Sequence, residues 1–294
     1  MKPLLFKIAK IEEETVRILQ EDYPYFYDNL HYHAETQIMV ILEGAGTYFI
    51  GDAIGNFKAG DIFILGSNLP HFFRSDKAYY EKNTHLRSKN ISIIFSLESL
   101  GEKLLELPEL HAIKKLLHYS KRGLMVNGKA QKQLYKSANK MVKKKGIERI
   151  LYLLKQLHRL SQSNELIALS HIDFDHETKP TDTKKVNIVI NFIMENFAKD
   201  ISLSEAADVA NLSVNAFCRF FKQHTRKTFS QFLNEIRIGH ACKQLIEEGY
   251  SVKEVAFDSG YYNISYFNRQ FKLITGYTPS EYIKTHNQKH NQTS

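Results

Sequence analysis

The sequence predicts a two-domain α+β protein, with a β-barrel or sandwich in the N-terminal part and helices after it. Three observations carry this prediction. Short β-branched and aromatic runs alternate with glycines up to about residue 98, apolar residues then recur at helical spacing, and the last hundred residues contain one unit twice. The chain has 294 residues, of which 43% are hydrophobic, which is ample for two hydrophobic cores.

Four runs of β-branched and aromatic residues predict strands, and the glycines between them predict turns. The runs are Gln37–Leu42, Gly46–Ile50, Asp61–Leu65 and Ile91–Phe95. Many short strands separated by turns are typical of a sandwich or a small barrel. We therefore expect a barrel domain over residues 1–98.

Leucines and isoleucines at helical spacing predict a helical segment over residues 99–162, in which Gly146 ends a lysine-rich helix over residues 129–145. Such apolar stripes most often pack inside one chain, but a dimer interface uses the same pattern. We expect this segment to mediate dimerisation. Residues 163–184 are polar and acidic, and we expect a linker there.

The charge and cysteine content narrow the class of protein. The net charge is +8, and residues 101–160 alone carry 15 basic and 4 acidic residues. A local basic excess favours a polyanionic partner, although many basic helices are only solvated faces. Cys218 and Cys242 are the two cysteines, which excludes a disulfide scaffold and fits a reducing compartment. Without a signal-peptide pattern or a long apolar run, we expect a cytoplasmic protein with no membrane partner.

An internal repeat lies in the last hundred residues. Shifting residues 206–230 by 50 positions gives nine identities. They pair Ala206, Asp208, Phe217, Arg219, Phe221, Lys222, Thr225, Thr228 and Ser230 with Ala256, Asp258, Phe267, Arg269, Phe271, Lys272, Thr275, Thr278 and Ser280. Two copies exclude a solenoid, which needs at least three.

Each copy predicts a helix-turn-helix unit within a domain over residues 185–290. The four predicted helices are Leu203–Ala210, Val214–His224, Val252–Asp258 and Ile264–Ile274. Ser213 and Asn263 are the expected N-caps of the second helices, and a long helix over Ser230–Glu248 joins the units. Gly276 suits the residue after the last of these helices, and Pro279 prevents its continuation.

The second helix of each copy carries side chains that can bind DNA. Arginine can bond guanine and asparagine can bond adenine, while lysine suits phosphate contacts. For one arginine alone, a solvated helix face is the better explanation. Two copies with the same arginine and lysine positions favour DNA binding instead. The candidates are Asn215, Cys218, Arg219 and Lys222 in the first copy and Ser265, Asn268, Arg269 and Lys272 in the second.

These residues resemble the AraC/XylS family of transcriptional regulators. The resemblance rests on the motifs A-A-x-x-A (206–210), R-F-F-K (219–222), R-I-x-x-A-C-x-x-L (237–245), G-Y-Y-N-x-S-Y-F-N-R-Q-F-K (260–272) and G-Y-T-P-S-E-Y (276–282). It implies that the two units enter adjacent major grooves of one promoter half-site. By position, Asn215, Cys218 and Arg219 would face one groove, and Ile264, Ser265, Asn268 and Arg269 the next.

Two residues depart from the family pattern. Arg226 stands where the first unit usually carries glycine, the residue found at Gly276 in the second, so we expect that turn to be built differently. Cys218 occupies a base-facing position but offers little hydrogen bonding, so we expect the first helix to read sequence weakly.

The N-terminal part resembles a cupin. His31, His33 and Gln37 lie in the first motif, and Gly60-Asp61, Pro70 and His71 in the second. His31 and His33 share one strand face by alternation. Gln37 replaces the metal-ligating glutamate of cupins, so we expect no metal and no cofactor. The expected effector site is His31, His33, Gln37 and His71, with Tyr48 and Arg74 nearby. Three histidines holding a metal, or histidines with a structural role only, remain the alternatives.

The resemblance implies a non-enzymatic, ligand-responsive regulator of transcription. Its expected partners are double-stranded promoter DNA, a small-molecule effector such as a carbohydrate, a second copy of the chain, and RNA polymerase. Activation is the expected effect. The rival hypothesis is a metal-dependent cupin enzyme, a dioxygenase or isomerase, that uses His31, His33 and His71. A third hypothesis is a DNA-binding protein whose barrel only dimerises.

Overall fold

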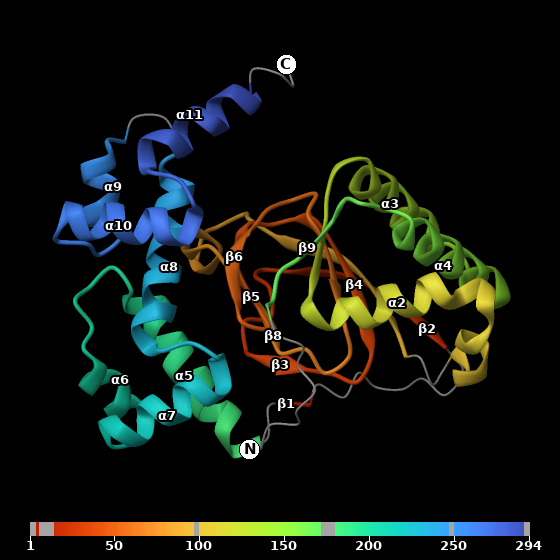
Figure 1. Ribbon diagram of the computed structural model, residues 1–294, viewed down its shortest axis with the longest axis horizontal. Helices are drawn as coiled ribbons and strands as arrows, with labels where there is room; N and C mark the ends of the chain where they lie inside the picture. The colour runs from red at the N-terminus through yellow and green to blue at the C-terminus, as the bar shows by residue number, and fades with distance from the viewer. Residues whose placement is uncertain (1–3, 6–14, 97–99, 172–179, 247–249, 291–294) are drawn as a thin grey trace. The chain divides into compact units, whose positions relative to one another are not determined.

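The computed structural model describes residues 4–5, 15–96, 100–171, 180–246 and 250–290. The chain divides into two compact units, Met1–Thr183 and Lys184–Ser294. In the described residues, the first unit combines two sheets with helices, and the second is helical throughout (Figure 1). The predicted α+β class with two domains is confirmed.

Two β-sheets form the first unit. One is five-stranded, in the order β1 (Leu4–Leu5), β3 (His31–Tyr32), β8 (His71–Ser75), β5 (Gly46–Ile50) and β6 (Ala53–Phe57). The other is six-stranded, in the order β11 (Leu166–Ala168), β10 (Leu124–Val126), β7 (Ile62–Leu65), β4 (Thr36–Glu43), β9 (Ser88–Phe95) and β2 (Val16–Tyr23). The sheets remain separate among the described residues, so the expected barrel is not closed.

The four predicted strands are present as β5, β7 and slightly longer forms of β4 and β9. Strands β2, β6 and β8 were not predicted. Strand β2 ends in the polar run Gln20-Glu21-Asp22, and β6 contains Gly55 and Asn56, which have low strand propensity. Pairing with a neighbouring strand makes such segments extended in spite of their composition. Strand β2, for example, lies antiparallel to β9 along its whole length.

Strand β4 is buried on both of its faces. Ile38 and Val40 point into a core between the six-stranded sheet and the helices. Met39 and Ile41 alternate with them and point into a second core between the two sheets. Neighbouring β7 divides its side chains in the same way. The uninterrupted apolar runs of these strands therefore reflect two covered faces.

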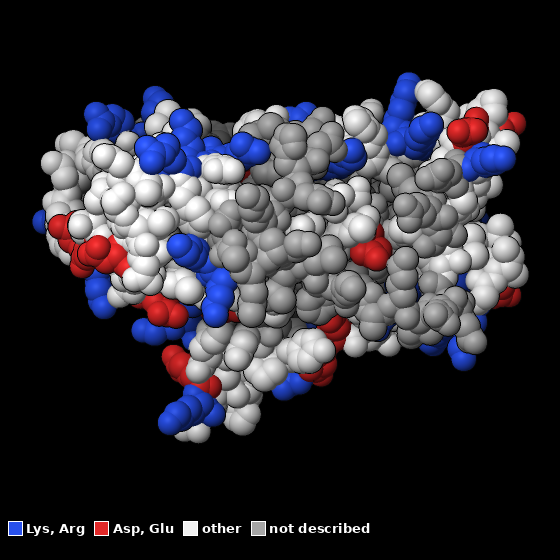
Figure 2. Space-filling model, turned by 90° about the horizontal axis from the view of Figure 1, so that it is seen from below, with Lys and Arg blue, Asp and Glu red and all other residues white. Residues whose placement is uncertain are grey.

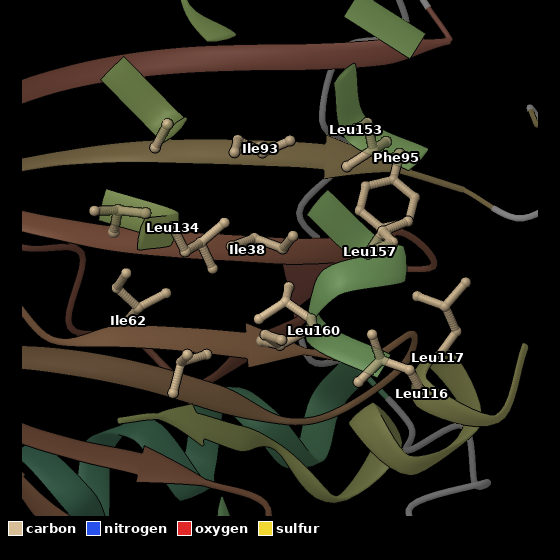
Figure 3. Close-up of a cluster of buried hydrophobic side chains, with 14 of the residues drawn as sticks. Ile38, Ile62, Ile93, Phe95, Leu116, Leu117, Leu134, Leu153, Leu157 and Leu160 are labelled. Atoms are coloured by element: carbon tan, nitrogen blue, oxygen red, sulfur yellow. The ribbon is translucent and has the colours of Figure 1, made fainter. Parts of the chain in front are cut away.

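Helices cover the outer face of the six-stranded sheet (Figure 1). After the short 3-10 turns η1 (Lys77–Tyr80), η2 (Glu102–Glu106) and η3 (Pro108–Leu110) come α2 (His111–Tyr119), η4 (Ser120–Arg122), α3 (Gly128–Met141) and α4 (Gly146–Ser161). Leu153, Leu157 and Leu160 of α4 pack over Ile38 and Ile93 of the sheet (Figure 3). Of the leucines and isoleucines that predicted this segment, four belong to the core of the same chain and three are exposed. The core residues are Ile113, Leu116, Leu117 and Leu157, and the exposed ones are Leu107, Ile147 and Leu151.

Two local predictions in this region were wrong, one for residues 166–168 and one for Gly146. Residues 124–126 form β10 beside the edge of β7, and Leu166–Ala168, placed in the expected linker, form β11 beside β10. Strand β10 pairs the backbone groups at the edge of β7, and β11 then pairs the outer edge of β10. Gly146 begins α4 with a φ of +52°, whereas α3 already ends at Met141.

The described residues of the second unit form seven helices. They are α5 (Pro180–Asn196), α6 (Leu203–Val209), α7 (Val214–Thr225), α8 (Phe229–Gln244), α9 (Val252–Asp258), α10 (Ile264–Thr275) and α11 (Pro279–His290). The four predicted helices of the repeat are confirmed within one residue. The joining helix is shorter than predicted, because it ends at Gln244. Part of the remaining prediction, residues 247–248, lies outside the described residues. None of the described helices is long and apolar enough to cross a membrane.

Prolines begin two of these helices. Helix α5 starts at Pro180, inside the expected linker, and α11 starts at Pro279. The first position of a helix tolerates proline because its backbone N–H would have no partner there. Pro279 therefore starts a new helix as well as following the end of α10.

The two helix-turn-helix units differ by one residue in their turns. Leu212 N donates to Ala207 O in the first unit, and Tyr261 N donates to Ala256 O in the second. Ala207 therefore corresponds to Ala256, an offset of 49, although the later helices keep the offset of 50. The pairings of Ala206 with Ala256 and of Asp208 with Asp258 were wrong by one position. One additional residue, at Tyr262, lengthens the second turn.

The turns that follow α7 and α10 share one geometry, contrary to the prediction for Arg226. Arg226 has a φ of +59° and Gly276 a φ of +79°, both left-handed. Their backbone N–H groups donate to the carbonyl oxygens of Lys222 and Lys272, each at 2.9 Å. Arginine thus takes the conformation that glycine adopts without strain.

We expect Arg226→Gly to stabilise the second unit by about 0.5–1 kcal/mol. A left-handed conformation costs a residue with a Cβ about 1–2 kcal/mol, of which the greater freedom of glycine in the unfolded chain cancels part. Gly276→Ala is the matched control and should destabilise by about 1 kcal/mol, because a Cβ there meets no atom within 4 Å and adds only backbone strain. Thermal unfolding of both variants measures this, and a less stable Arg226→Gly protein would contradict it.

Candidate ligand pocket and nucleic-acid interface

The four residues of the expected effector site meet in one pocket between the two sheets. His31 comes from β3, His33 from the residue after it, Gln37 from β4 and His71 from β8. The other lining residues are Leu19, Glu21, Tyr23, Phe26, Tyr27, Met39, Phe73, Asn90, Ser92 and Ile94. Residues that lie up to 75 positions apart in the sequence, and on both sheets, thus line one pocket.

The three histidine rings lie against one another. The centroids of His31 and His71 are 4.3 Å apart, and those of His33 and His71 are 5.1 Å apart. Each ring holds its Nδ1 atom 2.8–2.9 Å from a backbone carbonyl oxygen two residues away. A carbonyl oxygen only accepts, so the neutral rings of His31 and His71 carry the proton on Nδ1 and keep the Nε2 lone pair. His33 differs, because its Nε2 faces a second acceptor, Gln37 Oε1.

Burial keeps these histidines neutral. Loss of solvation lowers the pKa of His31 to about 4, and the nearby His33 adds to the shift. Burial also lowers the pKa of His71, with contributions from both other histidines, and the pKa of His33. At neutral pH the pocket therefore presents uncharged imidazoles.

A row of hydrogen-bonding side chains crosses the six-stranded wall. Gln37 Oε1 lies 3.1 Å from His33 Nε2, and Gln37 Nε2 donates to Ser92 Oγ at 2.8 Å. Asn90 Nδ2 donates to Ser92 Oγ and to Glu21 Oε2, each at 2.8 Å. The pocket therefore offers amide, hydroxyl and carboxylate groups side by side.

Sequence reasoning missed Glu21, Asn90 and Ser92. Glu21 lies on β2, which was not predicted. The available signal was in β9, where Asn90 and Ser92 alternate with the isoleucines of a strand that is otherwise apolar. Polar residues at every second position of a buried strand indicate a polar cavity on one face.

Tyr23 and Tyr27 complete the pocket, and both are about half exposed. The ring of Tyr27 meets His31 edge-on at 5.1 Å. Tyr48 and Arg74, expected nearby, do not line the pocket. The Tyr48 ring packs against Phe63 deeper in the core, and Arg74 points to the outer face of β8, where it pairs with Asp28 at 3.6 Å.

Helices α7 and α10 expose the remaining candidate residues. Phe217 and Phe221 bury one face of α7, and Phe267 and Phe271 bury the same face of α10. The opposite faces expose Asn215, Cys218, Arg219 and Lys222 on α7 and Ser265, Asn268, Arg269 and Lys272 on α10. Ile264 differs from these, because it is half-buried against the core of the second unit.

A polar network supports Arg269. Its guanidinium lies over the ring of Tyr266, 5.2 Å from the centroid. Asn234 Nδ2 donates to the hydroxyl of Tyr266, and Asn234 Oδ1 accepts from Tyr261. Arg219 has Ala216 at the matching position, so its guanidinium lacks the corresponding ring. The second helix-turn-helix copy therefore holds Arg269 in a more ordered position than the first copy holds Arg219.

Charge on the surface is mixed. Figure 2 shows basic and acidic side chains interspersed over one face of the molecule. Any contact with a polyanion therefore depends on particular helices and not on a uniformly basic face.

Comparisons with known proteins match a part of each unit to a protein family. Residues 15–137 match the family described as AraC-like ligand binding domain, and residues 206–285 match a helix-turn-helix domain family. A relative from Pseudoalteromonas carrageenovora, described as an uncharacterized HTH-type transcriptional regulator in the cgkA 5′ region, is 33% identical over 113 residues, 37% of this chain and 67% of the relative. The chain belongs to the AraC family of transcriptional regulators.

Two other AraC-family relatives match across both units. The HTH-type transcriptional activator RhaS of Pectobacterium carotovorum subsp. carotovorum is 23% identical over 263 residues, 85% of each chain. The melibiose operon regulatory protein of Escherichia coli is 22% identical over 280 residues, 90% of this chain and 87% of the relative. The family resemblance seen in the sequence is confirmed.

The pocket of this AraC-family regulator does not fit the metal site of a cupin. The carboxylate ligand is replaced by Gln37, whose amide lies against the His33 Nε2 that a metal would need. Across the described residues, no three His, Cys, Asp or Glu side chains form a group that could hold a metal ion. The enzyme alternative based on His31, His33 and His71 is not supported.

We expect the first unit to lose stability as the pH falls from 7 to 5. Its histidines have lowered pKa values when folded but ordinary values near 6.5 when unfolded, so the unfolded chain takes up protons first. Each histidine adds at most about 1.4 kcal/mol per pH unit to the loss. Urea unfolding at several pH values should show a shallower dependence for His31→Gln than for the unchanged protein. Equal dependences would contradict the assignment.

Proposed function

We propose that this AraC-family regulator activates transcription from promoters that α7 and α10 read, under control of a small molecule bound in the first unit. The observation that carries this proposal is the matched pair of helices, in which Arg219 and Lys222 recur as Arg269 and Lys272 on exposed faces. RNA polymerase is the expected protein partner, and the cytoplasm is the expected location because the promoter lies there.

Base reading is assigned to the exposed side chains near the start and middle of each helix. Asn215, Cys218 and Arg219 face one major groove in this proposal, and Ser265, Asn268 and Arg269 face the next. Ile264 contributes at most its exposed edge. Lys222 and Lys272 lie one turn further along and contact phosphates.

The pocket suits an uncharged ligand rich in hydroxyl groups, and we propose a carbohydrate. Neutral imidazoles and the row from Gln37 to Glu21 can each donate to or accept from hydroxyls. Tyr23 and Tyr27 can stack on the apolar face of a sugar ring. One relative is named for the melibiose operon, and melibiose is a sugar.

We assign dimerisation to residues 99–162. Residues 163–184 are the linker in this proposal, apart from the residues that form β11. Helix α4 buries one side in the core but leaves Ile147 and Leu151 66% and 60% exposed, one turn apart. Two exposed aliphatic residues at this spacing fit a helix–helix contact between copies of the chain.

Genomic pull-down with the full chain at near-physiological salt tests the proposed function. We expect enrichment of a few promoters that share two short boxes about one helical turn apart. Repeating the experiment with added sugars should change the enrichment, and genes beside the promoters would indicate which sugar. Recovery of bulk DNA alone under all conditions would overturn the proposal.

We expect Arg269→Ala to weaken binding to an enriched promoter by about 1–3 kcal/mol and to relax specificity at one base pair. Arg219→Ala should cost less, because Arg219 has no ring like Tyr266 to order it. Lys272→Ala should weaken all sequences alike and reduce the salt slope by about one. Competition binding with single-base variants of the promoter measures each effect. Uniform loss in Arg269→Ala would contradict its role.

We expect the double variant Ile147→Glu, Leu151→Glu to raise the dimer dissociation constant at least tenfold, since the loss of apolar burial exceeds about 1.4 kcal/mol. Leu86→Glu, Ile167→Glu is the matched control, because these two aliphatic side chains are also exposed but lie outside residues 99–162. Sedimentation of the three proteins gives the result. A dimer unaffected by the first variant would exclude this face of α4.

A further inference from the structure

Helix α3 exposes a row of lysines on one side. Lys132, Lys136 and Lys140 lie in the helix and Lys143 follows it, and all four are exposed. Their spacing of four, four and three residues keeps them on one face. Leu134, Ala138 and Met141 on the other face are buried in the core. The four lysines are called the lysine stripe below.

The lysine stripe is not neutralised by the rest of the described chain. Residues 124–147 contain seven lysines and no acidic residue. Lys144 pairs with Glu148 at 2.9 Å, and Glu165 accepts from the backbone N–H groups of Lys129 and Ala130. No ion pair or hydrogen bond joins a stripe ammonium group to any residue that the structure describes.

This arrangement weakens the helix that carries it. Like charges four residues apart repel and destabilise a helix by about 0.2–0.5 kcal/mol per pair. Lys132, Lys136 and Lys140 form two such pairs, and the neutral Gln133 and Asn139 are the exposed residues between them. A bound polyanion would remove the repulsion.

We propose that the lysine stripe binds the phosphate backbone of duplex DNA outside the boxes read by α7 and α10. The choice of DNA rests on the proposed function. The stripe spans about 16 Å, along which a duplex presents about ten phosphates. Lysines suit phosphate contacts that strengthen binding without reading sequence.

An anionic membrane is the less suitable partner. A helix that binds in a membrane surface inserts its apolar face among the lipids. The apolar face of α3 is already buried against the sheet through Leu134, Ala138 and Met141. Only the lysines are left to make contact, and that fits the surface of a duplex.

Full-length protein and a mixed-sequence duplex of about 60 base pairs test the proposal. The stripe variant replaces Lys132, Lys136, Lys140 and Lys143 by Gln, which keeps helix propensity. The control variant replaces Lys77, Lys82, Lys103 and Lys114 by Gln, an equal change of charge at exposed positions of the same unit. A third variant, Arg219→Ala, Lys222→Ala, Arg269→Ala and Lys272→Ala, removes the proposed contacts of α7 and α10.

Affinity is measured against salt concentration. Each lost phosphate contact lowers the slope by about 0.9, so the stripe variant should lose about 2–4 from its slope and the control less than one. The third variant should keep weak, salt-dependent binding that disappears when the stripe substitutions are added. Thermal unfolding confirms that all variants are folded.

Equal slopes for the stripe and control variants would overturn the inference. Loss of binding to phosphatidylserine vesicles with an unchanged DNA slope would overturn it too, and would assign the stripe to a membrane surface. If the third variant binds an enriched promoter as well as the unchanged protein, the proposed roles of α7 and α10 fail instead. The salt dependence of DNA binding by the stripe variant would still test the role of the lysine stripe.

Discussion

The two-sided burial of the six-stranded sheet is the constraint on which the first unit depends. Strand β4 supplies Ile38 and Val40 to one core and Met39 and Ile41 to the other. A register shift of one residue would place Gln37 among the helices and Ile38 in the pocket. The antiparallel pairing of β4 with β7 and β9 therefore determines which side chains line the pocket and which contact the helices.

The same alternation brings the pocket close to the helices. Gln37 and Ser92 line the pocket, while their sequence neighbours Ile38 and Ile93 pack under the helices. A ligand that contacts the first pair is thus one residue away from the surface on which α4 rests. A packed core does not deform gradually. A shift of the pocket wall that carries Gln37 and Ser92 therefore requires the helices on the other face of the sheet to adjust. This places the proposed effector and dimer surfaces on opposite faces of one sheet.

In the second unit, the two helix-turn-helix copies differ in the contacts that hold the arginine of their second helix. Both end their second helices in a left-handed residue, whether arginine or glycine. In the second copy alone, Tyr261 and Asn234 hold Tyr266, on which Arg269 lies, and Arg237 covers Tyr261 at 5.5 Å. An arginine held in place loses less entropy on binding, so the second copy is the better candidate for specific base contacts.

Local patterns in the sequence determined the α+β class, four strands, the helices of the repeat with their caps at Ser213 and Asn263, and the histidines of the pocket. These features follow from residue periodicity and capping within a few positions of the chain. Tertiary structure decided the rest. Strand β10 forms along the edge of β7, and β11 forms along the edge of β10. The turn at Arg226 forms because hydrogen bonds and packing outweigh its strain. Glu21, Asn90 and Ser92 join the pocket because β2 and β9 pair, and pairing between distant segments is invisible to a local pattern.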